Sequence, residues 1–187
     1  IKTSSSEVLE LSNLIIKVNC PSESEINIFK DNTILIGMLN PSKNKNLIDK
    51  IFNKKIKPFS LELLPRITRA QSMDVLSPQS NLAGYRAVIE SVGEFEKAVP
   101  MMMTAAGTVP AAKILIIGAG VAGLQAIATA KRLGAIVSAT DVRVASKEQV
   151  ESLGGKFLTV EQTEDLETAG GYAKETSDEY KKKQAQM

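Results

Sequence analysis

The chain has 187 residues, of which 43% are hydrophobic and only 4% aromatic, so we expect one domain or one and a part with an aliphatic core. The formal net charge is +2 and no basic stripe stands out, which argues against a nucleic-acid partner. The single cysteine, Cys20, excludes an internal disulfide and a multi-cysteine metal site, and we expect a small buried or half-buried residue there. No window approaches the roughly 18 uninterrupted apolar residues that span a bilayer, so no membrane insertion is predicted.

The N-terminal third alternates between strand and helix patterns. Apolar runs predict strands at 14–18, 33–37 and 57–64, and helical spacing predicts helices at 22–30 and 46–52. Ser22 with Glu25 has the spacing of a capping box. Alternation of this kind indicates a parallel sheet.

A polar stretch without a period, residues 65–81, leads into a long helix predicted from near Pro78 to about Lys97. One face of this helix can be buried through Leu82, Tyr85, Val88, Ile89 and Val92, and we expect the helix to bridge two lobes. The next segment is apolar and contains Met101, Met102 and Met103, for which we expect a packing role.

A second alternation of strands and helices follows. The patterns predict a strand at 112–117, a helix at 121–133, a strand at 136–140, a helix at 146–153 and a strand at 156–160. Residues 161–175 are aperiodic and predict a surface loop, and a capping-box pattern at 176–179 predicts a return to helix.

Gly118, Gly120 and Gly123 form a Gly-x-Gly-x-x-Gly turn between a predicted strand and a predicted helix. The first glycine allows the tight turn, the second lets backbone approach a pyrophosphate, and the third lets helix and strand pack closely. Asp141 follows about 20 residues later at the end of the next strand, where it can accept hydrogen bonds from ribose hydroxyls and repel a 2′-phosphate. We therefore predict an NAD site, although Arg143 could accommodate a 2′-phosphate.

A second group of hydrogen-bonding side chains includes Arg66, Gln71, Asp74, Ser77 and Tyr85. Such a segment could line the cleft that holds a nicotinamide ring. From these residues alone, a purely structural surface loop is equally open.

Five separated segments resemble, in the family's order, the NAD(H)-binding domain of proton-translocating NAD(P) transhydrogenases, which is related to alanine dehydrogenase. They are residues 65–74, 79–86, 118–125, 140–143 and 167–174. The resemblance implies an enzyme component that takes part in direct hydride transfer from NADH to NADP⁺ on a partner domain. A separate membrane domain would carry the protons.

The resemblance also assigns expected roles. The residues implied at the nicotinamide end are Arg66, Gln71, Asp74 and Ser77, with Gln71 between the two nicotinamide rings and Tyr85 beside that site. Tyr172 matches the tip of a mobile loop that closes over the nucleotide. The residues implied to hold NAD(H) are Gly118, Gly120, Val121, Ala122, Gly123, Asp141, Val142 and Arg143. No general acid or base is required, which fits a chain without histidine.

The resemblance further implies NADP(H) on the partner domain, a homodimer, and a cytoplasmic location at the inner face of the bacterial inner membrane through partner subunits. We predict a two-lobed α/β fold with Rossmann-like parallel sheets, both incomplete. The expected parts are a partial first lobe at 1–77, a bridging helix and linker at 78–112, and the N-terminal part of a Rossmann lobe at 113–187. We expect a fragment. An alanine dehydrogenase-like oxidoreductase and a non-catalytic NAD-binding remnant of a truncated gene stay open as alternatives.

Overall fold

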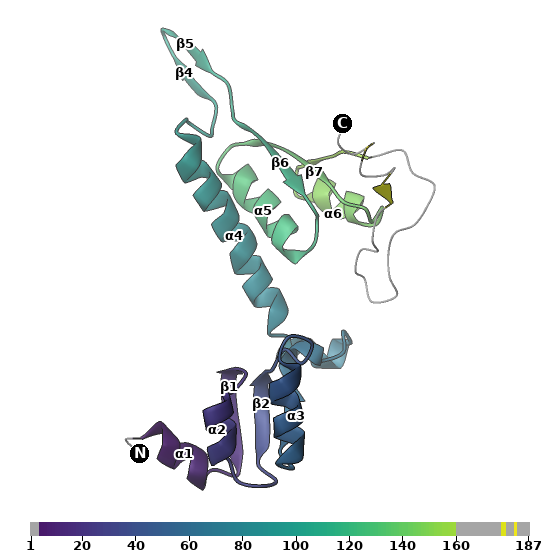
Figure 1. The fold of residues 1–187 in the computed structure, drawn as a ribbon. Helices are drawn as coiled ribbons and strands as arrows, with labels where there is room; N and C mark the ends of the chain where they lie inside the picture. The colour runs from purple at the N-terminus through teal and green to yellow at the C-terminus, as the bar shows by residue number, and fades with distance from the viewer. Residues whose placement is uncertain (1–3, 160–176, 179–181, 183–187) are drawn as a thin grey trace. The chain divides into compact units, whose positions relative to one another are not determined.

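The computed structural model describes residues 4–159, 177, 178 and 182 (Figure 1). The chain divides into two compact units, Ile1–Leu76 and Ser77–Met187, and each is described by itself. Within the described ranges, no helix is both long enough and apolar enough to cross a membrane.

Unit 1 is built on a three-stranded parallel sheet of order β1-β2-β3. Its register pairs Ile15 of β1 with Leu35 of β2, and Leu35 with Pro58 of β3. Because each crossover passes through a helix, the sheet alternates with helices as the sequence predicts. The elements are α1 Ser5–Leu11, β1 Leu14–Asn19, α2 Glu23–Ile28, β2 Ile34–Met38, α3 Lys45–Asn53, β3 Lys57–Ser60 and the 3₁₀ helices η1 Leu61–Leu63 and η2 Thr68–Met73.

Hydrogen bonds at both ends of α2 stabilise this helix. The predicted capping box of α2 is present, since the Ser22 hydroxyl accepts from the Glu25 N–H and the Glu25 carboxylate accepts from the Ser22 N–H. At the other end of α2, the Lys54 ammonium donates to the carbonyls of Ile26 and Phe29 at 3.0 and 2.6 Å, which satisfies oxygens that the helix leaves open. The core beneath is aliphatic apart from one phenylalanine: Leu9, Ile15, Ile26, Phe29, Leu35, Leu39, Ile51 and Ile56.

Unit 2 contains a second three-stranded parallel sheet, of order β6-β7-β8. This is the arrangement of the first three strands of a doubly wound dinucleotide fold. The predicted Rossmann-like α/β architecture is confirmed in this part of the chain. The elements are α4 Leu76–Phe95, β4 Met102–Thr104, β5 Gly107–Val109, β6 Lys113–Ile117, α5 Val121–Arg132, β7 Ile136–Thr140, α6 Ser146–Ser152 and β8 Lys156–Phe157.

One face of the β6-β7-β8 sheet carries the core of unit 2. Ala126, Ile127 and Ala130 of α5 are buried against Val137 and Ala139 of β7. Helix α5 also contacts α6, so both helices lie on this face, as successive right-handed crossovers require. Helix α4 adds Val88 to the same core.

Two expectations about the middle of the chain are wrong, and a third is confirmed. The strand predicted at 57–64 ends at Ser60, because Leu61–Leu63 turns into a 3₁₀ helix. The long helix predicted from near Pro78 to about Lys97 is confirmed as α4, and η2 lies within the aperiodic stretch before it. The predicted apolar face of α4 is only partly buried: Val88 is buried, whereas Leu82 and Tyr85 are 60% and 47% exposed.

The three methionines are the clearest correction. We expected them to pack in a core, but they lead into and form one arm of the β4-β5 hairpin, which extends beyond the end of α4 in Figure 1. Met101, Met102 and Met103 are 58%, 50% and 72% exposed. Methionine spacing alone does not distinguish a core strand from an exposed hairpin arm, because the side chain suits both.

Candidate functional site

The glycine turn after β6 has the geometry that its sequence predicts. Gly118 takes a φ of +94°, which favours glycine over every other residue. A Cβ at Gly123 would stand 1.8 Å from the carbonyl oxygen of Gly118, so the helix can approach the strand only without a side chain there. At Gly120 the nearest group to a built Cβ is the Arg143 guanidinium, 3.9 Å away, so the backbone of the turn is open to an approaching ligand.

Asp141 stands where β7 ends and joins two segments of the site. Its Oδ2 accepts from the Ala119 N–H at 2.6 Å, which fastens the glycine turn to the neighbouring strand. Arg143 binds the same carboxylate from the side chain, with Nε to Oδ1 and Nη2 to Oδ2 both at 2.9 Å, and its backbone N–H donates to Oδ1 at 2.8 Å. The carboxylate is therefore saturated with donors at the place where ribose hydroxyls are predicted to bind.

Electrostatics keeps this carboxylate ionised. The Asp141 side chain is only 6% exposed and that of Arg143 18%. Burial acts to raise the pKa of Asp141, but the hydrogen bonds from Arg143 and from the Ala119 N–H outweigh it and hold the pKa below its ordinary value. A fixed negative charge beside an open glycine turn is the arrangement that favours a ribose diol over a 2′-phosphate.

Helix α5 begins directly at the glycine turn, with Gly120 as its N-cap. Val121 and Ala122 are the first two residues of this helix, so their N–H groups are among the four that a helix leaves without an internal partner. Unpaired N–H groups and the positive end of the helix dipole favour a pyrophosphate at this end.

A contact that sequence reasoning missed supports the turn from behind. Gly84 of α4 is buried, and a Cβ there would stand 2.0 Å from the carbonyl oxygen of Ala122. Helix α4 thus lies with its backbone directly against the first turn of α5. A glycine in the interior of a long helix costs stability and usually has a packing reason, which was the available signal.

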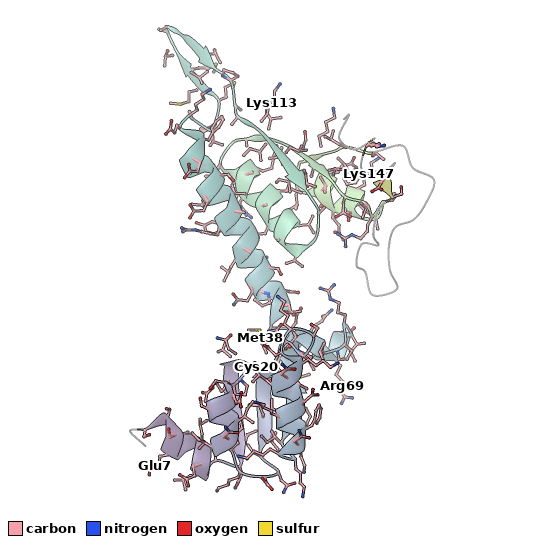
Figure 2. The ribbon with its side chains drawn as sticks, viewed as in Figure 1. Glu7, Cys20, Met38, Arg69, Lys113 and Lys147 are labelled. Carbon is pink, nitrogen blue, oxygen red and sulfur yellow. The ribbon has the colours of Figure 1, made fainter. Side chains whose placement is uncertain are left out.

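The remaining predicted residues fall in three places. Tyr85 lies next to Gly84 on α4 and is half exposed. Arg66 and Gln71 are exposed on the segment around η2, which Figure 2 shows at the label of Arg69. Asp74 Oδ1 accepts from the Leu76 N–H at 2.8 Å, so this side chain caps the start of α4.

The predicted site residues are divided between the two units, and each unit is described by itself. Arg66, Gln71 and Asp74 belong to unit 1, while Ser77, Tyr85 and the glycine turn belong to unit 2. Val142 lies between the two members of the Asp141 and Arg143 pair. Tyr172 and its predicted loop lie outside the described residues.

Cys20 is half-buried and free, as expected. Burial raises the pKa of its thiol, so Cys20 lacks the lowered pKa of an activated nucleophile.

Comparison with protein families gives two matches that together take in nearly the whole chain. Residues 1–83 match the model described as alanine dehydrogenase/PNT, N-terminal domain, and residues 87–186 match alanine dehydrogenase/PNT, C-terminal domain. Both matches are to the alanine dehydrogenase/PNT family, whose name covers two kinds of protein. Individual relatives show which of the two kinds this chain resembles more.

Two relatives are each named as the first portion of the alpha subunit of an NAD(P) transhydrogenase. The one from Rhodospirillum rubrum is 54% identical over 193 residues, covering 100% of this chain and 50% of that protein. The one from Rickettsia prowazekii is 53% identical over 182 residues, covering 95% of this chain and 48% of that protein. An alanine dehydrogenase of Methanococcus maripaludis is 28% identical over 162 residues. The chain spans about half the length of the curated relatives it matches.

Solved structures agree with this. The structure of a transhydrogenase from Sinorhizobium meliloti is 55% identical, with a TM-score of 0.79 over 84% of this chain and 47% of that one. An L-alanine dehydrogenase structure has a TM-score of 0.69 at 21% identity, which supports the fold alone. The α/β fold of this chain with its parallel sheets is thus found in solved structures.

The contact at Gly84 gives a prediction with a control in the same helix. Gly84→Ala must displace α4 or α5, so we expect it to lower the free energy of unfolding by about 1–3 kcal/mol, the usual effect of overpacking. At Gly93 of α4 a Cβ would meet nothing within 4 Å, so Gly93→Ala should raise that free energy by roughly 0.5–1 kcal/mol. Urea unfolding of both variants measures the difference. Equal effects would show that α4 does not depend on contact at Gly84.

The Asp141 pair gives a prediction about pH. Because its pKa is lowered on folding, ionised Asp141 contributes stability above its ordinary pKa of 3.8, and that contribution is lost as pH falls through the lowered value. We expect Asp141→Asn to cost about 1–3 kcal/mol at neutral pH, since it weakens charge-assisted hydrogen bonds. The cost should shrink towards zero below the folded-state pKa. Urea unfolding of both proteins across this range tests it, and a cost independent of pH would contradict it.

Proposed function

Because the chain belongs to the alanine dehydrogenase/PNT family, we propose that it is the NAD(H)-binding component of an NAD(P) transhydrogenase. The observation that carries the proposal is the open glycine turn fastened to the buried carboxylate of Asp141. The choice of transhydrogenase over alanine dehydrogenase is supported by identities of 53–54% against 28–30%. An alanine dehydrogenase-like activity is the second candidate, favoured only by the shared family.

The site's own groups suggest how NAD(H) would be held. The pyrophosphate would lie over Gly120, where the start of α5 offers N–H groups and no side chain intervenes. The adenosine ribose would hydrogen-bond to Asp141. Since Arg143 already donates to both oxygens of this carboxylate, ribose binding requires it to give up part of that contact. Arg143 therefore competes with the ribose and tunes nucleotide affinity.

The segment around η2 would bind the nicotinamide end of the cofactor. The bound nucleotides supply the chemistry, a hydride passing from NADH to NADP⁺ on a partner domain. The chain contributes position: Arg66 would orient the cofactor, Asp74 and Ser77 would hold the loop or the carboxamide, and Gln71 would steer the approach of the second ring. In this proposal Tyr85 lies beside the rings and Tyr172 closes over them.

Partners and location follow from the same proposal. NADP(H) would be bound by another domain of the transhydrogenase, and protons would cross through a separate membrane domain. We propose that the chain acts at the cytoplasmic face of the bacterial inner membrane through those partners, as a homodimer.

A nucleotide titration tests the cofactor assignment. We expect the 187-residue chain to bind NADH at least about tenfold more tightly than NADPH, a difference of about 1.4 kcal/mol, because the Asp141 carboxylate repels the 2′-phosphate. Asp141→Asn should remove most of this preference. Asp49→Asn removes an exposed carboxylate of unit 1 and is the matched control. Calorimetry measures the affinities of each protein for both nucleotides, and a preference kept in Asp141→Asn would reject the assigned role.

Hydride transfer tests the role of the unit 1 segment. In a complete transhydrogenase that contains this sequence, Gln71→Ala should slow the hydride step at least about tenfold, because misplacement of two rings by a fraction of an ångström is costly. The affinity for NADH should change little. Gln149→Ala, at an exposed position of α6, is the control. Rapid-mixing absorbance reports the step, and an unchanged rate in Gln71→Ala would sink the proposal for this residue.

A further inference from the structure

Two groups with opposite nucleotide preferences stand close together at the end of β7. A doubly wound fold carries an acid here when it binds NAD, whereas a nearby arginine accommodates the 2′-phosphate of NADP. In this chain Asp141 is the acid and Arg143 is the arginine. The contact between them therefore decides which preference the site expresses.

The Arg143 guanidinium is held on the Asp141 carboxylate as a fork. Nε donates to Oδ1 and Nη2 donates to Oδ2, both at 2.9 Å. The two side chains are only 18% and 6% exposed, so salt screens their attraction little. Opposite charges this close cancel at longer range, so the pair presents almost no net charge to an approaching nucleotide.

The backbone of Arg143 is anchored separately from its side chain. The N–H donates to Asp141 Oδ1 at 2.8 Å, and the carbonyl accepts from the Ser146 N–H at 3.1 Å. An asparagine at position 141 would keep an oxygen for the same N–H. The side chain joins this fixed backbone through several rotatable bonds, so the guanidinium can leave the carboxylate without leaving the site.

The guanidinium also lies beside the glycine turn. A Cβ built on Gly120 would have Nη2 of Arg143 as its nearest neighbour, at 3.9 Å. The second glycine of this motif lets backbone approach the pyrophosphate, and the acid after the next strand binds the ribose. Arg143 thus reaches the space between these two parts of the site, where a phosphate on the ribose 2′-oxygen would project.

We infer that Arg143 is a latent binding group for a ribose 2′-phosphate, and that Asp141 disfavours NADP(H) chiefly by occupying this guanidinium. The inference rests on the proposed NAD(H) site and names a second residue that sets its selectivity. A 2′-phosphate would have to break two charge-assisted hydrogen bonds and then face the released carboxylate. A neutral side chain at position 141 would release the guanidinium from that charge, and its planar fork matches the oxygens of a phosphate.

Simple repulsion by the Asp141 carboxylate predicts a different result. If repulsion alone excluded the 2′-phosphate, removing the negative charge would improve NADPH binding by the same factor with or without Arg143. If Asp141 acts by holding the guanidinium, the improvement depends on Arg143. A double-mutant cycle over the two positions separates these mechanisms.

Calorimetric titration of the 187-residue chain and its variants with NADH and NADPH tests the inference. We expect Asp141→Asn to bind NADPH at least about tenfold more tightly than the unaltered chain, because the released guanidinium gains charge-assisted hydrogen bonds. Asp141→Asn combined with Arg143→Gln should lose most of this gain and keep its NADH affinity within about threefold, since NADH has no 2′-phosphate. Arg143→Gln alone should not raise the NADPH affinity.

Two further variants in the Asp141→Asn background serve as controls. Arg143→Lys keeps the charge without the fork and should retain part of the gain. Arg132→Gln removes an exposed cation in the last turn of α5 and should retain all of the gain, which excludes an effect of net charge alone. Circular dichroism verifies each fold, and Asp141→Ser is a second neutral form that keeps an oxygen acceptor for the Ala119 N–H.

The outcomes separate the inference from the proposed function. Failure of the unaltered chain to bind NADH rejects both. When NADH binds, equal NADPH affinities of Asp141→Asn and its Arg143→Gln derivative overturn the inference alone and assign the exclusion to repulsion. Equal weakening of NADH and NADPH by Arg143→Gln in that background also overturns it, because the guanidinium would then act on the diphosphate that both nucleotides share.

Discussion

Three backbone segments of unit 2 come together at distances that no side chain permits, and the rest of the nucleotide site depends on this approach. Gly123 brings α5 against the carbonyl of Gly118, and Gly84 brings α4 against the carbonyl of Ala122. Because glycine has no side chain, the helices pack directly against the backbone of the turn and hold it in place, and no side chain covers its N–H groups. The first N–H groups of α5 therefore stay available while the helix is held from two sides. A ligand meets a site whose shape is already formed, which lowers the entropy cost of binding.

The charge at this site is fixed by the same small set of groups. Asp141 accepts from the turn through Ala119 and from Arg143, so one buried carboxylate links β7, the glycine turn and a guanidinium. The side chains of Asp141 and Arg143 are only 6% and 18% exposed, so losing one of these hydrogen bonds without a replacement would leave a buried charge uncompensated. A ribose diol offers two hydroxyl donors to replace those of Arg143, whereas a 2′-phosphate offers negative charge. In the proposed function, both the selectivity for NAD(H) and the ordering of the turn would arise from one carboxylate.

The sequence predicted the features of this protein that local chemistry determines. The capping box at Ser22, the glycine turn and the alternation of strands with helices were predicted because each depends on residues a few positions apart. The end of β3 at Ser60 and the exposure of Met101 to Met103 were not, because burial depends on which distant segments supply a second layer. The contact of Gly84 with Ala122 was missed for the same reason: helix-interior glycine signals a close approach without naming the partner. Roles at Arg66, Gln71 and Tyr172 came from family resemblance and stay predictions.

Within the described residues, the helices between the parallel strands of each unit lie on one face of its sheet, and this shared asymmetry follows from chirality. Successive right-handed crossovers in one direction place all their helices on the same side. In unit 1 the buried row of Ile15 and Leu35 lies on that side, whereas Ile16, Val18 and Phe59 on the other side are 57–71% exposed. Covering such a face requires a chain that reverses direction across the sheet, which none of the described segments does. The dinucleotide motif needs only the first βαβ segments, so the local chemistry of the site depends on the covered face and the glycine turn rather than on the opposite face of the sheet.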